Sequence, residues 1–323
     1  MKRRFGLTTF GAALACAGLF GCGGGGGGGG GGDSGLPQPP STPIAISASN
    51  INQVTDASLD PAVGGTGAFG ASIASTDTPQ SNPRVLLRAM EAVSSQARTP
   101  RSSGSPLSDA PVTEPCLVSG SVTVDSTSNS ATIQFNNCSD VAGQSINGSV
   151  TATGVVESNT SFQANFSVDI TFTETGSQPL RMVGAFSISE NCPSGAGSCV
   201  GTFSGSSLGA AHGTEVWFIS SFAITSVESP GFIDVTAGYV ISSNQLNGSV
   251  QVITNGPIRF ASGAQYPQSG IIEITGAANS KALITITSSN PVDTNAVQVQ
   301  LDANGDTTFE INNSYSWDQL EAI

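Results

Sequence analysis

The feature that most constrains how this chain folds is a long alternation of apolar and polar residues. Its clearest run extends from Phe162 to Thr173, where apolar side chains at even positions alternate with polar ones at odd positions. A β-strand places successive side chains on opposite faces, so this run predicts a strand with one apolar and one wet face. Similar runs recur almost to Ile323. We therefore predict a mainly β protein, a long antiparallel meander that curls into an open barrel or sandwich.

Pairing of small residues with large ones predicts the register of neighbouring strands. Residues 146–156 and 162–172 fit together when paired positions sum to 318, which sets Val156 opposite Phe162. Residues 180–188 fit against 162–172 at a sum of 352. Three consecutive strands then share one consistent register.

A short repeat with the pattern apolar-X-Gly-Ser-Val occurs at 118–122, 146–150 and 246–250. Asn-Gly pairs favour hairpin turns, but the alternation continues through Asn147 and Asn247. We therefore predict strand at both, with the glycines on the apolar face making room for large neighbours on adjacent strands.

Four cysteines lie in the C-terminal part of the chain, namely Cys116, Cys138, Cys192 and Cys199. An even number in an exported chain predicts disulfides, with three connectivities to choose from. Spacing favours 116 with 138, at the base of a hairpin, and 192 with 199, around a small loop. The rival, a four-cysteine zinc site, lacks pairs at metal-ligand spacing, and no metal is expected.

The same pairing rule sets Gly120 opposite Phe135 in the first hairpin. That register leaves Cys138 on the wrong face to reach Cys116. The disulfide therefore requires a β-bulge near Asn136, where one strand gains a residue.

The remaining elements follow from the same patterns. Further strands are predicted at 215–225, 232–242, 257–262, 270–275, 282–287, 296–302 and 307–312, and turns at 125–130, 157–160, 288–294 and 304–305. One short helix is predicted from Asn82 as N-cap to Val93. The chain then divides into a signal segment at 1–21, a Gly/Pro-rich tether at 22–43, a mixed region with a helix and polar linker at 44–115, and an antiparallel β domain at 116–323.

The N-terminus has the pattern of a secretory signal. Lys2-Arg3-Arg4 precedes an apolar stretch from Phe5 to Phe20 that is too short to span a bilayer comfortably. Leu19-Phe20-Gly21-Cys22 resembles the lipobox of bacterial lipoproteins, which implies acyl chains, palmitate among them, on Cys22. The alternatives are an ordinary secretory signal, or a weaker lipobox ending at Cys16.

Glycines fill every position from Gly23 to Gly32, a flexible spacer of the kind an anchored domain needs. Because Gly23 replaces the Asp that resembles an inner-membrane retention signal, we expect a lipid-anchored location in the outer membrane. Loss of the signal leaves 7 of 10 basic residues against 23 acidic ones, a net charge of −16. Such a chain repels phosphate backbones, so nucleic-acid binding is not expected.

Motifs for chemistry are weak. Gly205-Ser206-Ser207-Leu208-Gly209 with His212 matches a nucleophile elbow, but that motif needs a strand-to-helix turn in an α/β sheet. Asp302-Ala-Asn-Gly-Asp306 resembles the start of a calcium loop but lacks the later glycine and acid, and a hairpin turn at 304–305 explains it. No catalytic residue and no cofactor is therefore predicted. A transmembrane barrel would need more than three Tyr and two Trp for its aromatic girdles.

Taken together, the motifs resemble a loose group of proteobacterial lipoproteins of unknown activity, with a Gly-rich tether and a β-rich, disulfide-containing domain. The motifs that carry it are Leu-Phe-Gly-Cys22, Phe135-Asn-Asn-Cys138, Leu301-Asp-Ala-Asn-Gly-Asp306 and Trp317-Asp-Gln-Leu320. The resemblance implies an anchor and no activity. We expect a non-enzymatic binding or structural envelope component that holds the membrane by its lipid and takes an apolar ligand or envelope partner. The alternatives are an envelope hydrolase and a surface adhesion protein.

Overall fold

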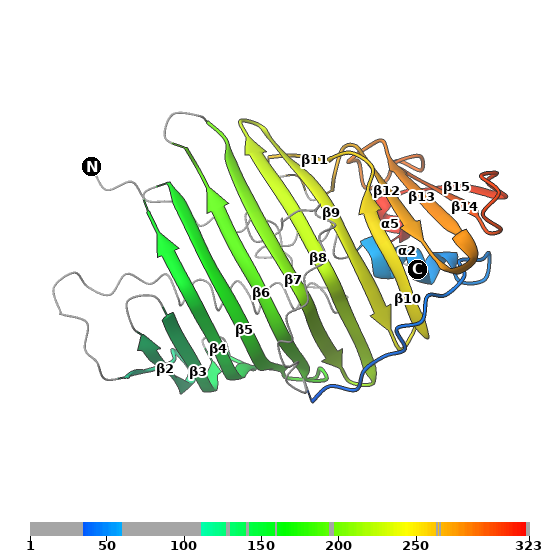
Figure 1. The fold of residues 1–323 in the computed structure, drawn as a ribbon. Helices are drawn as coiled ribbons and strands as arrows, with labels where there is room; N and C mark the ends of the chain where they lie inside the picture. The colour runs from blue at the N-terminus through cyan, green and yellow to red at the C-terminus, as the bar shows by residue number, and fades with distance from the viewer. Residues whose placement is uncertain are drawn as a thin grey trace, which may run out of the picture.

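The computed structural model describes residues 35–59, 111–126, 130–139, 142–158, 160–193, 197–262, 264 and 266–320. These residues form a mainly β protein built on one antiparallel sheet of 15 strands, as the alternation predicts. The strand order runs from β1 to β10 in chain order and then through β12, β13, β14 and β15. Figure 1 shows β2 to β10 side by side as a broad twisted sheet, with the shorter β12 to β15 at one end. Among the residues that the structure describes, the sheet is open, because its edge strands β1 and β15 each pair with one neighbour and not with each other.

The element bounds are as follows. The strands are β1 (Val112–Pro115), β2 (Ser119–Ser126), β3 (Ser130–Ser139), β4 (Gln144–Glu157), β5 (Ser161–Glu174), β6 (Leu180–Asn191), β7 (Cys199–His212), β8 (Glu215–Ser229), β9 (Phe232–Ser243), β10 (Gly248–Thr254), β11 (Ile258–Ala261), β12 (Gly270–Thr275), β13 (Lys281–Ile286), β14 (Val297–Asp302) and β15 (Ile311–Tyr315). The helices are α2 (Ile51–Leu59), the 3-10 turn η2 (Ala277–Asn279) and α5 (Trp317–Leu320).

The predicted register holds through most of the central meander. β5 pairs with β6 at a sum of 352 from Ser161 to Phe172, and β4 pairs with β5 at 318 as far as Thr153 opposite Asn165. The pairing of Val156 with Phe162 is wrong, because a bulge between Thr153 and Val156 moves Val156 opposite Gln163. Val156 is consequently 60% exposed.

The first hairpin contains the predicted bulge but has a different register. Phe135 lies opposite Val122 and not Gly120. The ladder of β2 with β3 shifts between Ser119 and Ser121, and that of β3 with β4 shifts between Phe135 and Cys138, where Asn137 has a φ of 47°. A Cβ on Gly120 would lie 2.0 Å from the carbonyl oxygen of Asn137, so this glycine permits close contact between two backbones and does not make room for an aromatic ring.

The two Asn-Gly pairs behave differently. Asn147 lies within β4, as predicted. Strand at Asn247 is wrong, because residues 244–247 form the turn between β9 and β10 and Asn247 has a φ of 53°. The expected burial of Leu246 and Gly248 is nevertheless observed.

The domain boundaries also differ from expectation. The sheet begins at Val112, four residues before Cys116, because β1 pairs with β2. The helix predicted at 82–93 lies outside the described residues. Within the mixed region the structure instead has α2, whose Ile51, Val54 and Leu59 are buried at the i, i+3, i+8 spacing of one helix face. The N-terminal part of that region therefore belongs to the core of the sheet.

Candidate functional site

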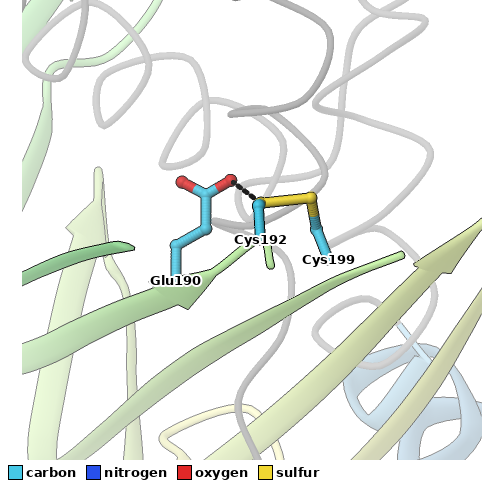
Figure 2. A group of neighbouring side chains, drawn as sticks. All are labelled: Glu190, Cys192 and Cys199. Carbon is cyan, nitrogen blue, oxygen red and sulfur yellow. Dashed lines mark hydrogen bonds between the residues drawn. A yellow bond between two sulfur atoms is a disulfide. The ribbon is translucent and has the colours of Figure 1, made fainter. Parts of the chain in front are cut away.

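The two predicted disulfides are present. Cys116, which directly follows β1, bonds Cys138 near the end of β3, with Cα atoms 5.5 Å apart. Cys192 bonds Cys199 between β6 and β7, with Cα atoms 4.2 Å apart. Figure 2 shows Glu190 beside the second bridge, its Oε1 lying 3.4 Å from Sγ of Cys192. A disulfide sulfur has no proton to donate and is no thiolate, so the bridge removes both sulfurs as metal ligands.

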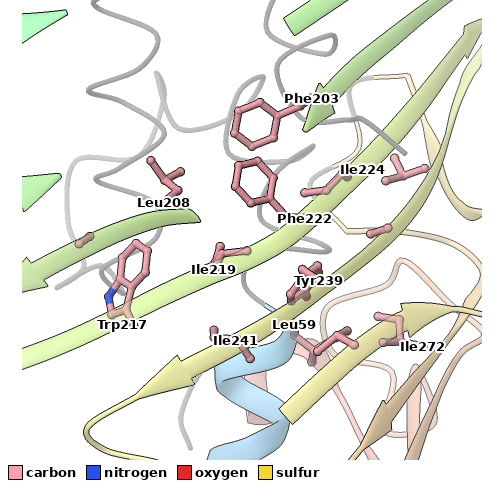
Figure 3. Close-up of a cluster of buried hydrophobic side chains, with 14 of the residues drawn as sticks. Leu59, Phe203, Leu208, Trp217, Ile219, Phe222, Ile224, Tyr239, Ile241 and Ile272 are labelled. Atoms are coloured by element: carbon pink, nitrogen blue, oxygen red, sulfur yellow. The ribbon is translucent and has the colours of Figure 1, made fainter. Parts of the chain in front are cut away.

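The apolar face carries a row of phenylalanines across four adjacent strands. The rings belong to Phe166 of β5, Phe186 of β6, Phe203 of β7 and Phe222 of β8, with successive centroids 5.2, 5.1 and 5.0 Å apart. Phe203 and Phe222 are visible together in Figure 3. None of the four is more than 9% exposed, so this face is filled. Cross-strand aromatic pairs at such distances stabilise a sheet beyond their buried area.

One acid shares the apolar face at the end of β8. Glu228 follows Ile224 and Ser226, both buried, at the same strand parity and lies opposite Cys199. Desolvation by burial raises the pKa of Glu228 above its ordinary value of 4.5. A carboxylate in this position weakens the fold when it is charged.

The serine and histidine of the elbow-like motif are separated by the sheet. Residues 205–209 lie inside β7, which continues to His212 without a turn into a helix. Ser207 pairs with Ser220 at positions on the polar face, whereas His212 shares parity with the buried Leu208 and Ala210. Side chains on opposite faces cannot form a nucleophile and base pair.

His212 does have an acidic neighbour at the end of its strand. It lies opposite Glu215 across the β7–β8 turn. Desolvation raises the pKa of Asp56, on α2, above its ordinary value of 3.8, and repulsion from Glu215 makes a smaller contribution in the same direction. The structure thus places Glu215 opposite His212 but leaves Ser207 on the other face.

The loop after β14 is organised by a buried carboxylate. Asp302 is 2% exposed and accepts from the backbone N–H groups of Gly305, Asp306 and Thr307 at 2.7, 3.2 and 2.9 Å. The predicted two-residue turn is therefore a longer loop, and the last strand begins at Ile311 and not at 307. Carboxylate oxygens of residues 302, 306 and 310 lie within 4.8 Å of one another, which is close enough to hold a metal ion. The carboxylate of Asp302, however, already accepts the backbone hydrogen bonds of the loop.

A further site, which the sequence patterns did not reveal, is the segment we call the clasp, residues 35–46. It starts on the polar face, where Leu36 is 8% exposed and packs against Val183, Val216 and Phe218. This group is a separate cluster from the main core, because its members alternate along β6 and β8 with residues that face the core.

Polar contacts hold the first residue of the clasp. Nη1 of Arg181 donates to the carbonyl oxygen of Gly35 at 3.3 Å. The other two guanidinium nitrogens, Nε and Nη2, donate to the two carboxylate oxygens of Asp169, each at 3.1 Å. These bonds raise the pKa of Arg181. Asp169 thereby orients Arg181 toward the clasp. The predicted tether at 22–43 is corrected accordingly, since its last part is bound to the sheet.

The clasp then occupies the edge of β10. The N–H of Ser249 donates to Thr42 and the N–H of Ile44 donates to Ser249, each at 3.0 Å, in a short parallel bridge. The carbonyl of Ile44 accepts from the N–H of Ala277 at 2.7 Å, and Ile46 donates to Oγ of Ser280 at 2.8 Å. Because β12 pairs with β10 only from Gln251 onward, the clasp fills a position that would otherwise be an unpaired edge.

After the clasp the chain enters the apolar face as α2. Leu59 lies among Tyr239, Ile241 and Ile272 in Figure 3. The hydroxyl of Tyr239 donates to the carbonyl of Ser58, which fixes the end of the helix. Residues 35–59 thus pass from the polar face, around one end of the sheet, to the apolar face, and Figure 1 shows the first part of this path as the dark blue segment below β8 to β10.

Cys22, the predicted lipidation site, lies outside the described residues. Of the helices in the described part of the chain, none is long and apolar enough to cross a membrane. Comparison with protein-family models, with curated proteins and with solved structures found no match.

Proposed function

We propose that this protein is an outer-membrane lipoprotein, anchored through acyl chains on Cys22, whose sheet is a non-enzymatic structural component of the envelope. The observation that carries the proposal is the clasp, because the residues that follow the Gly-rich spacer are bound to both faces of the sheet. Because the end of the spacer is held on the sheet, the lipid anchor is connected to the folded domain at a defined place. Two disulfides agree with an oxidising compartment outside the cytoplasm.

A structural role is favoured over binding of an apolar ligand by the burial of the apolar face. The four ring side chains of the phenylalanine row are between 2% and 9% exposed, so the face needs no ligand to remove it from water. The hydrolase alternative is supported by His212 and the neighbouring Glu215 but is weakened by the placement of Ser207. The adhesion alternative draws on the same anchored sheet.

Expression of the full chain in a Gram-negative host tests the anchor. The wild type is expected in the outer-membrane fraction, with a mass increased by its acyl chains, and Cys22→Ser is expected to lose both properties. Cys16→Ser serves as the matched control and is expected to keep both. An unmodified mass for the wild type would refute the anchor.

Native mass spectrometry of the purified protein tests the structural role separately. The expected result is the mass of the acylated chain alone. A co-purified lipid of constant mass would instead support the apolar-ligand version. Hydrolysis of ester or glycoside substrates that disappears in His212→Ala would support the hydrolase.

A further inference from the structure

The clasp determines which end of the sheet lies nearest the anchor. Leu36 contacts Val216 and Phe218, the second and fourth residues of β8, and Gly35 contacts the second residue of β6. Both strands begin at the end that also carries the turns at 213–214 and 244–247. We call this the anchor end. The opposite end, where the 230–231 turn joins β8 to β9, is the far end.

Chain length sets how far the anchor end can stand from Cys22. Only 12 residues separate Cys22 from Gly35, and most of them are glycine. A flexible chain of this length has a root-mean-square reach of about 19 Å, and a fully extended one spans about 40 Å. The 14 residues of β7 span about 46 Å. While Gly35 stays bound, the far end can therefore be the end nearest the bilayer only when the spacer is almost fully stretched.

We propose, resting on the lipoprotein function above, that the bilayer surface is the partner of the anchor end. The clasp holds the domain so that the turns at 213–214 and 244–247 face the lipid headgroups and the 230–231 turn points away. The sheet then projects from the membrane along its strands, and its two faces remain free of the bilayer.

One turn at the anchor end has exposed apolar side chains that agree with contact with the bilayer. The turn between β1 and β2 lies at this end and exposes two apolar side chains, Leu117 at 87% and Val118 at 55%. Exposed apolar side chains next to a bilayer gain from contact with its interface. The acidic side chains at the same end, Glu174 and Glu215, favour a membrane surface without strong negative charge.

Förster resonance energy transfer between a dye on the protein and acceptor lipids in the membrane tests the orientation of the domain. The natively acylated full chain is placed in phosphatidylcholine vesicles that contain a small fraction of headgroup-labelled acceptor lipid. A donor dye is attached at Gln245→Cys, in the anchor-end turn, or at Ser262→Cys, whose backbone N–H bonds Gly231 at the far end. Both native side chains are exposed. Several-fold stronger transfer is expected from position 245 than from position 262.

A longer spacer is the matched control. Insertion of about 40 Gly/Ser residues before Gly35 raises the root-mean-square reach to about 40 Å, close to the length of the strands, so the difference between the two dyes is expected to disappear. Equal or reversed transfer with the native spacer would overturn the orientation and leave the anchor intact. Binding of Cys22→Ser to the vesicles at the wild-type level would overturn the proposed function itself.

Discussion

Gly248 gives the most direct test of the clasp, since it begins β10 beneath the clasp backbone. A Cβ at this position would lie 2.3 Å from Cγ2 of Ile44 and 2.6 Å from the carbonyl oxygen of Thr42. Carbon atoms in contact prefer a separation of about 3.5 to 4.0 Å, so the clasp must move by more than about 1 Å in Gly248→Ala. Overpacking of this kind costs about 1 to 3 kcal/mol.

That cost is similar to the contribution of the two backbone hydrogen bonds that pair the clasp with β10. The two backbone hydrogen bonds between the clasp and Ser249 contribute about 1 kcal/mol each. We therefore expect Gly248→Ala to detach the clasp locally and to leave the rest of the sheet folded. Exchange of the Ile44 and Ser249 amides should speed up by about 5- to 150-fold, which corresponds to the 1 to 3 kcal/mol range.

Amide hydrogen exchange followed by mass spectrometry or NMR measures this effect. Protection of the central strands, at Val168 and Met182 for example, should not change. Gln251→Ala, an exposed change on the same strand, is the control and should leave the Ile44 amide as protected as in the wild type. Wild-type protection of Ile44 in Gly248→Ala would refute the contact between clasp and β10.

Four other perturbations test the core and the bridges by urea denaturation. Removal of the 116–138 disulfide should cost about 3.4 kcal/mol and removal of the 192–199 disulfide about 2.5 kcal/mol, because the first closes the longer loop in the unfolded chain. Phe186→Ala should cost about 3 to 5 kcal/mol, since its ring is 6% exposed between two others. Glu228→Gln should stabilise the protein at neutral pH. A raised pKa in the folded state means that stability falls as the pH rises above 4.5, so the gain should vanish well below that pH.

The central meander was predictable because its alternation is strict. In β5 every apolar residue from Ala164 to Ile170 is buried, and a pairing rule based on size then gives the register on both sides. The rule failed where the backbone departs from ideal geometry. Val156 and Gly120 both lie beside bulges. A bulge adds one residue to a strand, and the alternation of apolar and polar residues in the sequence does not reveal it.

The site was less predictable than the fold. Both disulfides followed from spacing, and the 116–138 bridge even required the bulge that the structure contains. The clasp has no strong pattern of its own, because its Pro and Ser residues are those of a linker. One available signal was the pair of glycines, Gly248 and Gly276, whose missing side chains leave space for Ile44 and Ile46 rather than for a strand neighbour. Such a contact joins distant parts of the chain and cannot be read from local periodicity.

The clasp also imposes an order on assembly. Its hydrogen bonds join residues 208 positions apart between Ser41 and Ser249, and 234 positions apart between Ile46 and Ser280. The first clasp residues, Gly35 and Leu36, have partners on β6 and β8, whereas the later ones need β10 and the 276–280 segment, which follow in the chain. The β10 end of the clasp therefore cannot close until the chain is available as far as Ser280, whereas the strands from β1 to β9 need no later segment in order to pair.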